Sequence, residues 1–259
     1  ADCLLVFGAS FSNHTGITSK IPTIQVDDDP MALARFHGID VPVWGEIGAT
    51  VATFLQGLKG DVAATDRRGR VAERWSGLNS ASIFAALSEA VPDDAIIAVD
   101  VGNNTYSFGR YFECRRQSVL MSGYLGSIGF SLPAAMGAWA ATREDDPRFA
   151  GRKVVSVSGD GGFGQYMGEL LTAVKYGMNI THVLLNNAEL GKISKEQRAG
   201  DWDVWQTSLH NPDFAEYARL CGAHGERVTD AAGIRPALER ALSHDGPALV
   251  ELVTDVELI

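Results

Sequence analysis

The sequence predicts an α/β protein built around a doubly wound parallel sheet, and three observations support this prediction. Short apolar runs alternate with longer amphipathic stretches, as strands alternate with crossover helices in such sheets. The chain has 259 residues, enough for one large domain or for one domain and part of another. Loops rich in glycine, asparagine and aspartate directly follow several apolar runs, which is where parallel sheets bind ligands.

The first section, residues 1–59, is expected to form a partial α/β domain. Its apolar runs predict strands at 3–7 and 23–26, and its amphipathic stretch predicts a helix at 47–58. Residues 60–78 are polar and charged and have no apolar period that could support a core element. We therefore expect a linker there and a second, larger unit over residues 79–259.

The second unit is expected to begin with a helix capped at Asn79 or Ser80, because side-chain oxygens at a helix start satisfy free backbone N–H groups. Strands are predicted at 95–99, 119–121, 154–158, 181–185 and 248–253. Helices are predicted at 130–141, 168–176, 212–221 and 231–242. The loops 101–106, 122–129, 159–163 and 186–191 would then meet at the carboxyl end of the sheet.

Charge and composition disfavour several classes of partner and site. The chain carries 22 basic and 32 acidic residues, a net charge of −10, which disfavours binding to nucleic acid. No stretch approaches the roughly 18 uninterrupted apolar residues of a transmembrane helix. Cys3, Cys114 and Cys221 are far apart, which disfavours a disulfide framework or a CxxC metal site and predicts a reducing, cytoplasmic location.

Two motifs at predicted strand ends carry the strongest functional signal. The segment Gly159-Asp160-Gly161-Gly162-Phe163 follows one strand, and Asn186-Asn187 follows the next. The Asp160 carboxylate and the Asn187 amide oxygen are hard ligands that suit Mg²⁺. Glycines allow backbone N–H groups to approach an anion closely. The motifs together predict a site for a metal ion and a phosphate.

The spacing of these motifs resembles the signature of enzymes that depend on thiamine diphosphate (ThDP). The segments 101–105, 123–135 and 190–197 extend the resemblance, and residues 79–259 look like the diphosphate-binding domain of the pyruvate oxidase and acetolactate synthase group. Residues 1–59 resemble the second half of the central domain of that group, which carries FAD in some members. Ser10, Asn13 and His14 depart from the pattern of those members, so FAD binding stays open.

The resemblance also implies roles for individual residues. Asp160 and Asn187 would bind Mg²⁺ through their side chains, and Glu189 through its backbone carbonyl. The Gly126 carbonyl would accept a hydrogen bond from the aminopyrimidine, and Ile128 would bend the cofactor as a catalytic wedge. The implied cofactor-binding set is Asn103, Asn104, Gly126, Ile128, Gly159, Asp160, Gly161, Gly162, Phe163, Asn187 and Ile193. Glu196 matches an active-site glutamate and is the second implied catalytic residue.

The implied activity is ThDP- and Mg²⁺-dependent decarboxylation of a 2-oxo acid, with pyruvate favoured, followed by oxidation or carboligation. In this family the glutamate that activates the cofactor lies on a pyrimidine-binding domain, which no segment before residue 79 resembles. We therefore expect the chain to belong to a longer enzyme and to be inactive alone. The intact enzyme is expected to be a homodimer or homotetramer, because the site of this family is shared between subunits.

Two alternative functions remain at this point. Gly159, Gly161 and Gly164 satisfy the pattern GxGxxG, which would indicate an NAD-dependent oxidoreductase. Such a site requires an acidic residue about 20 positions later, whereas the next strand here leads into Asn186 and Asn187. The other alternative is a non-catalytic α/β module that serves as an assembly partner.

Overall fold

The computed structural model describes residues 2–9, 20–58, 78–123 and 125–255. The chain divides into two compact units between Thr65 and Asp66. The predictions for residues 60–77 and for Ser10, Asn13 and His14 lie outside the described residues. Leu78, which we had placed at the end of the linker, is 4% exposed and packs in the core of the second unit.

The first unit is a small parallel sheet with the strand order β1-β2-β3. Its elements are β1 (Leu4–Phe7), β2 (Thr23–Asp27), β3 (Val41–Trp44) and α1 (Ile47–Gly57). The Glu46 carboxylate caps α1 by accepting hydrogen bonds from Gly48 N and Ala49 N at 2.8 and 2.6 Å. We did not predict β3, because Pro42 weakens a strand signal. A proline is compatible with this edge position, since it lacks only the N–H of one ladder bond.

The second unit is built on a six-stranded sheet in which all neighbouring strands are parallel and the order is β5-β4-β6-β7-β9-β8. This arrangement confirms the predicted doubly wound α/β fold. The strands are β4 (Ile96–Val99), β5 (Ser118–Met121), β6 (Val154–Gly159), β7 (Ile180–Asn186), β8 (His224–Val228) and β9 (Ala248–Val253).

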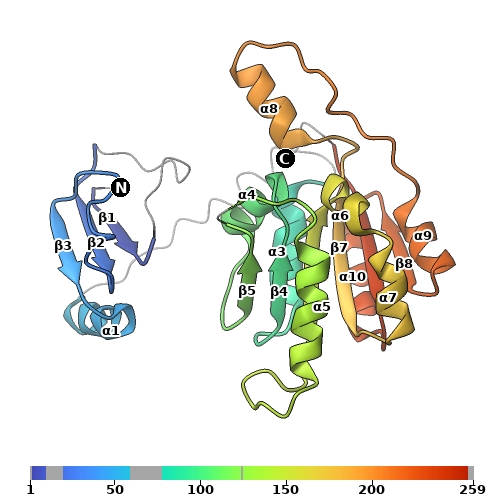
Figure 1. Cartoon of the computed structure of the whole chain (residues 1–259), viewed down its shortest axis with the longest axis horizontal. Helices are drawn as coiled ribbons and strands as arrows, with labels where there is room; N and C mark the ends of the chain where they lie inside the picture. Colours follow the sequence, from blue (N-terminus) through green and yellow to red (C-terminus); the bar gives the residue numbers. More distant parts are fainter. Residues whose placement is uncertain (1, 10–19, 59–77, 124, 256–259) are drawn as a thin grey trace. The chain divides into compact units, whose positions relative to one another are not determined.

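Helices cover both faces of this sheet (Figure 1). One face packs against α3 (Ser80–Ala90), α4 (Asn103–Tyr111) and α10 (Ile234–Ser243). The other face packs against α5 (Ser131–Thr142), α6 (Asp160–Tyr166), α7 (Glu169–Lys175) and α9 (Phe214–Leu220). Residues of β4 alternate between the two cores, with Ile97 and Val99 in the first and Ile96 and Ala98 in the second. This burial on both faces explains the continuous apolar runs of the central strands.

Some predicted boundaries differ from the structure. Two segments that we expected to be loops, 101–106 and 159–163, contain the first turns of α4 and α6. The predicted helix 212–221 begins at Phe214, and Asp213 caps it by accepting from Glu216 N at 2.7 Å. The edge strand β8 was not predicted, because its sequence HGERV is polar and only partly buried.

The topology fixes where a ligand can bind. From β4 the chain moves to β5 on one side, and it then returns to β6 on the other side of β4. The connections therefore leave the carboxyl ends of β4 and β6 in opposite directions, which opens a crevice there. Helix α8 (Gly191–Ala199) stands clear of the sheet beyond these strand ends (Figure 1). Within the described ranges, no helix combines the length and apolar character needed to span a bilayer.

Candidate functional site

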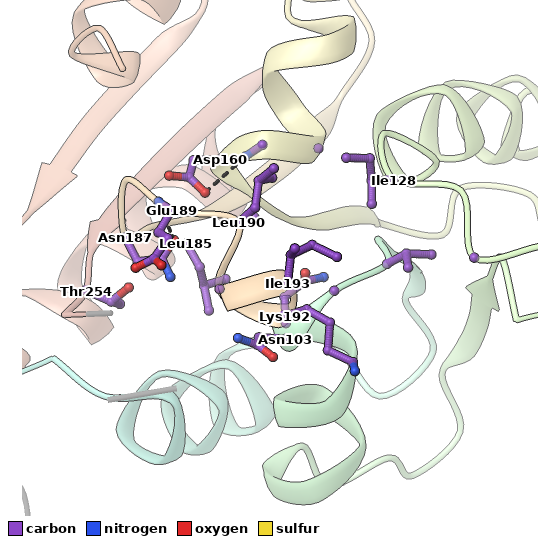
Figure 2. A pocket seen from close by; sticks show the side chains of 18 residues that line it. Asn103, Ile128, Asp160, Leu185, Asn187, Glu189, Leu190, Lys192, Ile193 and Thr254 are labelled. Atoms are coloured by element: carbon purple, nitrogen blue, oxygen red, sulfur yellow. Dashed lines mark hydrogen bonds between the residues drawn. The ribbon is translucent and has the colours of Figure 1, made fainter. Parts of the chain in front are cut away.

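A cavity of about 330 Å³ lies beyond the carboxyl ends of β4, β6 and β7. Its size falls within the range of small-molecule sites. The structure brings most of the predicted site residues to its walls, namely Asn103, Asn104, Gly126, Ile128, Gly159, Asp160, Gly161, Gly162, Asn187, Glu189 and Ile193. Asp160, Asn187 and Glu189 lie along one side of this cavity and Ile128 lies across from them (Figure 2).

Asp160 is the first residue of α6 and is 3% exposed. Its Oδ1 accepts a hydrogen bond from Gly161 N at 3.0 Å, and its Oδ2 accepts one from Asn211 Nδ2 at 2.7 Å. Burial raises the pKa of this carboxyl above its usual value, although the hydrogen bonds act in the opposite direction. A buried carboxylate at a cavity wall would gain from a bound cation.

Asn187 and Glu189 lie in the loop after β7, which is held by a second segment of the chain. Leu190 N donates to Thr207 O at 2.7 Å, and Leu209 N donates to Ala188 O at 2.8 Å. The Glu189 carboxylate accepts from Thr207 Oγ1 at 3.1 Å. That contact engages one oxygen of the Glu189 carboxylate and helps to hold the loop in place.

The loop that presents Ile128 is anchored by a buried carboxylate, Asp100, at the end of β4. Asp100 accepts hydrogen bonds from Val101 N at 2.7 Å, from Gly129 N at 2.9 Å and from Phe130 N at 3.2 Å. Burial raises the pKa of Asp100, and the three backbone donors oppose that rise. The carboxylate fixes the position of Ile128 through the two residues that follow it.

Two glycines of the motif allow close packing against this site. A Cβ atom on Gly162 would lie 2.2 Å from Asp100 Oδ2, and one on Gly161 would lie 2.6 Å from a methyl carbon of Leu190. Among the described residues, no atom outside the backbone of its own helix lies within 4 Å of the position of a Cβ on Gly164. The third glycine of the GxGxxG pattern is therefore not needed for packing, whereas in dinucleotide-binding folds it brings helix and strand together.

Two predicted residues lie away from the cavity. Phe163 is 1% exposed and packs between His182 and Phe214, at ring-centroid distances of 4.7 and 5.4 Å, so its side chain belongs to the core. Glu196 lies on α8, is more than half exposed and pairs with Lys192, which does line the cavity. Both residues flank the site rather than forming its wall.

The sequence analysis missed several polar residues that support the site. Asp100, Asn211 and Glu251 contribute hydrogen bonds to or behind the cavity wall. A signal existed for Glu251, which is the one charged residue of the apolar run Ala248–Val253. Asn211 directly precedes the predicted helix 212–221, and an asparagine at that place is typical of a helix cap. Among the described residues, no three His, Cys, Asp or Glu side chains gather as a metal cluster, so a metal here needs amide and carbonyl ligands as well.

Comparison with known proteins is consistent with this geometry. Residues 100–252 match the family described as "Thiamine pyrophosphate enzyme, C-terminal TPP binding domain". The chain is 33% identical to YdaP of Bacillus subtilis, a protein named for containing thiamine pyrophosphate, over 97% of this chain and 45% of that protein. It is 29% identical to the catabolic acetolactate synthase of Raoultella terrigena, over 90% of this chain and 43% of that enzyme. It is 28% identical to the large subunit of acetolactate synthase isozyme 2 of Escherichia coli, over 98% of this chain and 48% of that subunit.

Proposed function

The chain belongs to the thiamine pyrophosphate enzymes, and we propose that its cavity binds the diphosphate of ThDP through Mg²⁺. The observation that supports this proposal is the convergence of Asp160, Asn187 and Glu189 at one cavity wall. The Asp160 carboxylate, the Asn187 amide oxygen and the Glu189 carbonyl are the hard oxygen donors that Mg²⁺ prefers, and Mg²⁺ is usually held by one or two carboxylates together with phosphate oxygens. The donors present therefore fit the group.

The remaining walls fit the rest of the cofactor in this proposal. Asn103 and Asn104, which line the cavity, would contact the diphosphate, and Gly159, Gly161 and Gly162 would let the backbone come close to it. Ile128 would support the cofactor from the opposite side, and the Gly126 carbonyl would accept a hydrogen bond from its aminopyrimidine. Ile193 provides an apolar contact at the substrate side. When bound, ThDP supplies a carbon that adds to a 2-oxo acid and a ring that accepts the electrons released with carbon dioxide.

The residues of this chain hold the cofactor and shape the substrate side of the cavity. Ile128 and Ile193 would present apolar side chains to the reacting end. Lys192 provides a positive charge that favours the carboxylate of a 2-oxo acid, and its pairing with Glu196 holds that glutamate at the edge of the cavity. We propose that Glu196 acts on the substrate from this position.

For the whole enzyme we propose decarboxylation of a 2-oxo acid, with pyruvate favoured, followed by carboligation or oxidation. The names of two of the relatives, acetolactate synthases, favour carboligation. The chain spans less than half the length of each of the three relatives described above. We therefore expect it to bind ThDP but to release no carbon dioxide from pyruvate when assayed alone with ThDP and Mg²⁺. Clear decarboxylation by the purified chain would contradict this part of the proposal.

The cofactor proposal is tested by titrating ThDP into the chain by calorimetry, with Mg²⁺ and with EDTA. We expect saturable binding only with the metal. Titration with NAD should give no heat, which separates this function from the dinucleotide alternative. If neither ThDP nor NAD binds in Mg²⁺, the non-catalytic assembly module becomes the better description.

A further inference from the structure

A network of four polar side chains, three of them buried, leads from the wall of the cavity to the far strands of the sheet. It begins at the Asp160 carboxylate and passes through Asn211 and Asn186 to Glu251 on β9. Of these four residues, only Asp160 lines the cavity. Asn186 and Asn211 instead border a neighbouring pocket, which Arg227 also lines.

Glu251 is the fixed end of this network of side chains. Its side chain is fully buried and accepts hydrogen bonds from Asn186 Nδ2 at 2.7 Å and from Ala215 N at 3.1 Å. Arg227 on β8 pairs with it at 3.0 Å. A buried carboxylate is costly unless it is paired and hydrogen-bonded, and here both conditions are met. Its position is therefore set by three separate elements, α9, β8 and the end of β7.

The hydrogen bonds of the two amides permit one orientation only. Since the Glu251 carboxylate can only accept, the amide nitrogen of Asn186 must face it. The Asn186 Oδ1 atom then accepts from Ala188 N at 3.2 Å and from Asn211 Nδ2 at 2.9 Å. The same Asn211 nitrogen donates its other hydrogen to Asp160 Oδ2 at 2.7 Å. The hydrogen bond to Glu251 thus fixes the orientation of the Asn186 amide, and the Asn186 oxygen in turn fixes the orientation of the Asn211 amide.

Asn211 makes these contacts instead of capping the following helix. The cap of α9 is provided by Asp213, whose side chain accepts from Glu216 N. Asn211 is only partly buried, and both hydrogens of its amide point to groups at the site. Asn211 is therefore placed to orient Asp160, and the N-terminal cap of α9 does not need its side chain.

We propose that Asn211 is a positioning residue that orients the Asp160 carboxylate for the metal, and that Asn186 and Glu251 fix the orientation of Asn211. The inference rests on the proposed function, because it takes Asp160 as a metal ligand. Carboxylate ligands of metals are commonly held by hydrogen bonds from outer groups, and loss of such a partner lowers metal affinity by about 10–100-fold.

The test measures ThDP binding by calorimetry while Mg²⁺ is varied. We expect Asn211→Ala to raise the Mg²⁺ concentration needed for half-maximal binding by about 10-fold. We expect Asn211→Asp, which has nearly the same shape, to weaken binding further, because it sets one carboxylate against another. His210→Ala, a change at the exposed preceding residue, is the matched control and should bind like the wild type. Thermal unfolding without ligands should be the same for the Asn211→Ala and control variants.

Several results would overturn the inference. Binding by Asn211→Ala that equals the control would do so, as would Asn211→Asp that binds better than Asn211→Ala. A binding loss that is matched by an equal loss of thermal stability would also count against it. Glu251→Gln should raise the Mg²⁺ requirement in the same direction, but it also disturbs a buried ion pair, so the Asn211 variants decide the question. A wild-type chain that binds no ThDP in Mg²⁺ would instead refute the proposed function.

Discussion

Asp100 and Asp160 occupy equivalent positions at the carboxyl ends of the neighbouring strands β4 and β6, yet their surroundings differ. Both side chains are buried, and burial raises both pKa values. Asp100 accepts from three backbone N–H groups and faces only protein. Asp160 accepts from one backbone N–H within hydrogen-bond distance and from Asn211, and it lines the cavity. The two carboxylates therefore differ mainly in what they face, since Asp100 is enclosed by protein and holds the loop after β5, whereas Asp160 borders the cavity.

Removal of the Asp160 carboxylate should give the largest effect, and the effect should fall on binding. Asp160→Ala removes the one carboxylate among the proposed metal ligands, so we expect Mg²⁺-dependent ThDP affinity to fall at least about 100-fold, or several kcal/mol. Calorimetric titration measures this loss. Undiminished binding by the variant would exclude the proposed metal site.

Removal of the Asp100 carboxylate should instead reduce stability. Asp100→Ala leaves three backbone N–H groups without their partner, and each buried donor without a partner costs about 1–3 kcal/mol. We expect a loss of about 3 kcal/mol in the free energy of unfolding, measured by equilibrium denaturation in urea. The comparison of the two aspartates would fail if Asp160→Ala destabilised the fold by as much as Asp100→Ala.

The glycine that packs against Asp100 provides a smaller test. Gly162→Ala would place a methyl group 2.2 Å from Asp100 Oδ2, and overpacking of this kind costs about 1–3 kcal/mol. Gly164→Ala is the matched control on the same helix, because no atom of another described element lies within 4 Å of the added methyl group. We expect urea denaturation to show a loss for the first variant and a small gain for the second. Equal stability of both variants would contradict the close packing.

His182 is a third buried polar side chain, and like Asp100 it faces only protein. Burial lowers its pKa from 6.5 to about 3, and its ring contacts Ser158 Oγ at 2.9 Å. The folded state therefore keeps this imidazole neutral while the unfolded state takes up a proton below pH 6.5. As the pH is lowered from 6.5 to about 3, we expect the free energy of unfolding to fall by up to about 1.4 kcal/mol per pH unit. Above pH 6.5 this group should not affect the free energy of unfolding.

Urea denaturation of the wild type and of His182→Gln across this pH range measures that contribution. The variant should show the shallower decline, because it lacks the imidazole that must stay neutral. Parallel pH profiles for the two proteins would show that His182 is not held neutral in the folded state.

Much of the fold could be predicted from the sequence, because buried parallel strands are continuous apolar runs between amphipathic helices. The run Ala248–Val253 was placed at its observed bounds for this reason. The edge strands β3 and β8 were missed, since Pro42 interrupts one and polar residues make up much of the other. Helix α4 was taken for a loop, because Gly102-Asn103-Asn104 is typical of turns.

The sequence predicted those residues of the candidate site that come directly after a strand. Asp160 and Asn187 meet at the cavity because parallel strands bring their carboxyl ends to one edge. Asn211 and Glu251 could not be connected to Asp160 in this way. Their contacts depend on how a distant loop and the far strand β9 pack behind the site, and no local pattern encodes that packing.

The most direct test is a crystal structure of the chain grown with ThDP and Mn²⁺, in which anomalous scattering locates the metal. We expect one metal peak at about 2.1 Å from the Asp160 carboxylate, the Asn187 amide oxygen and the Glu189 carbonyl, with the diphosphate beside it. We expect no metal at Asp100. A metal peak at Asp100, or a diphosphate bound outside the cavity at the ends of β4 and β6, would contradict the proposed site.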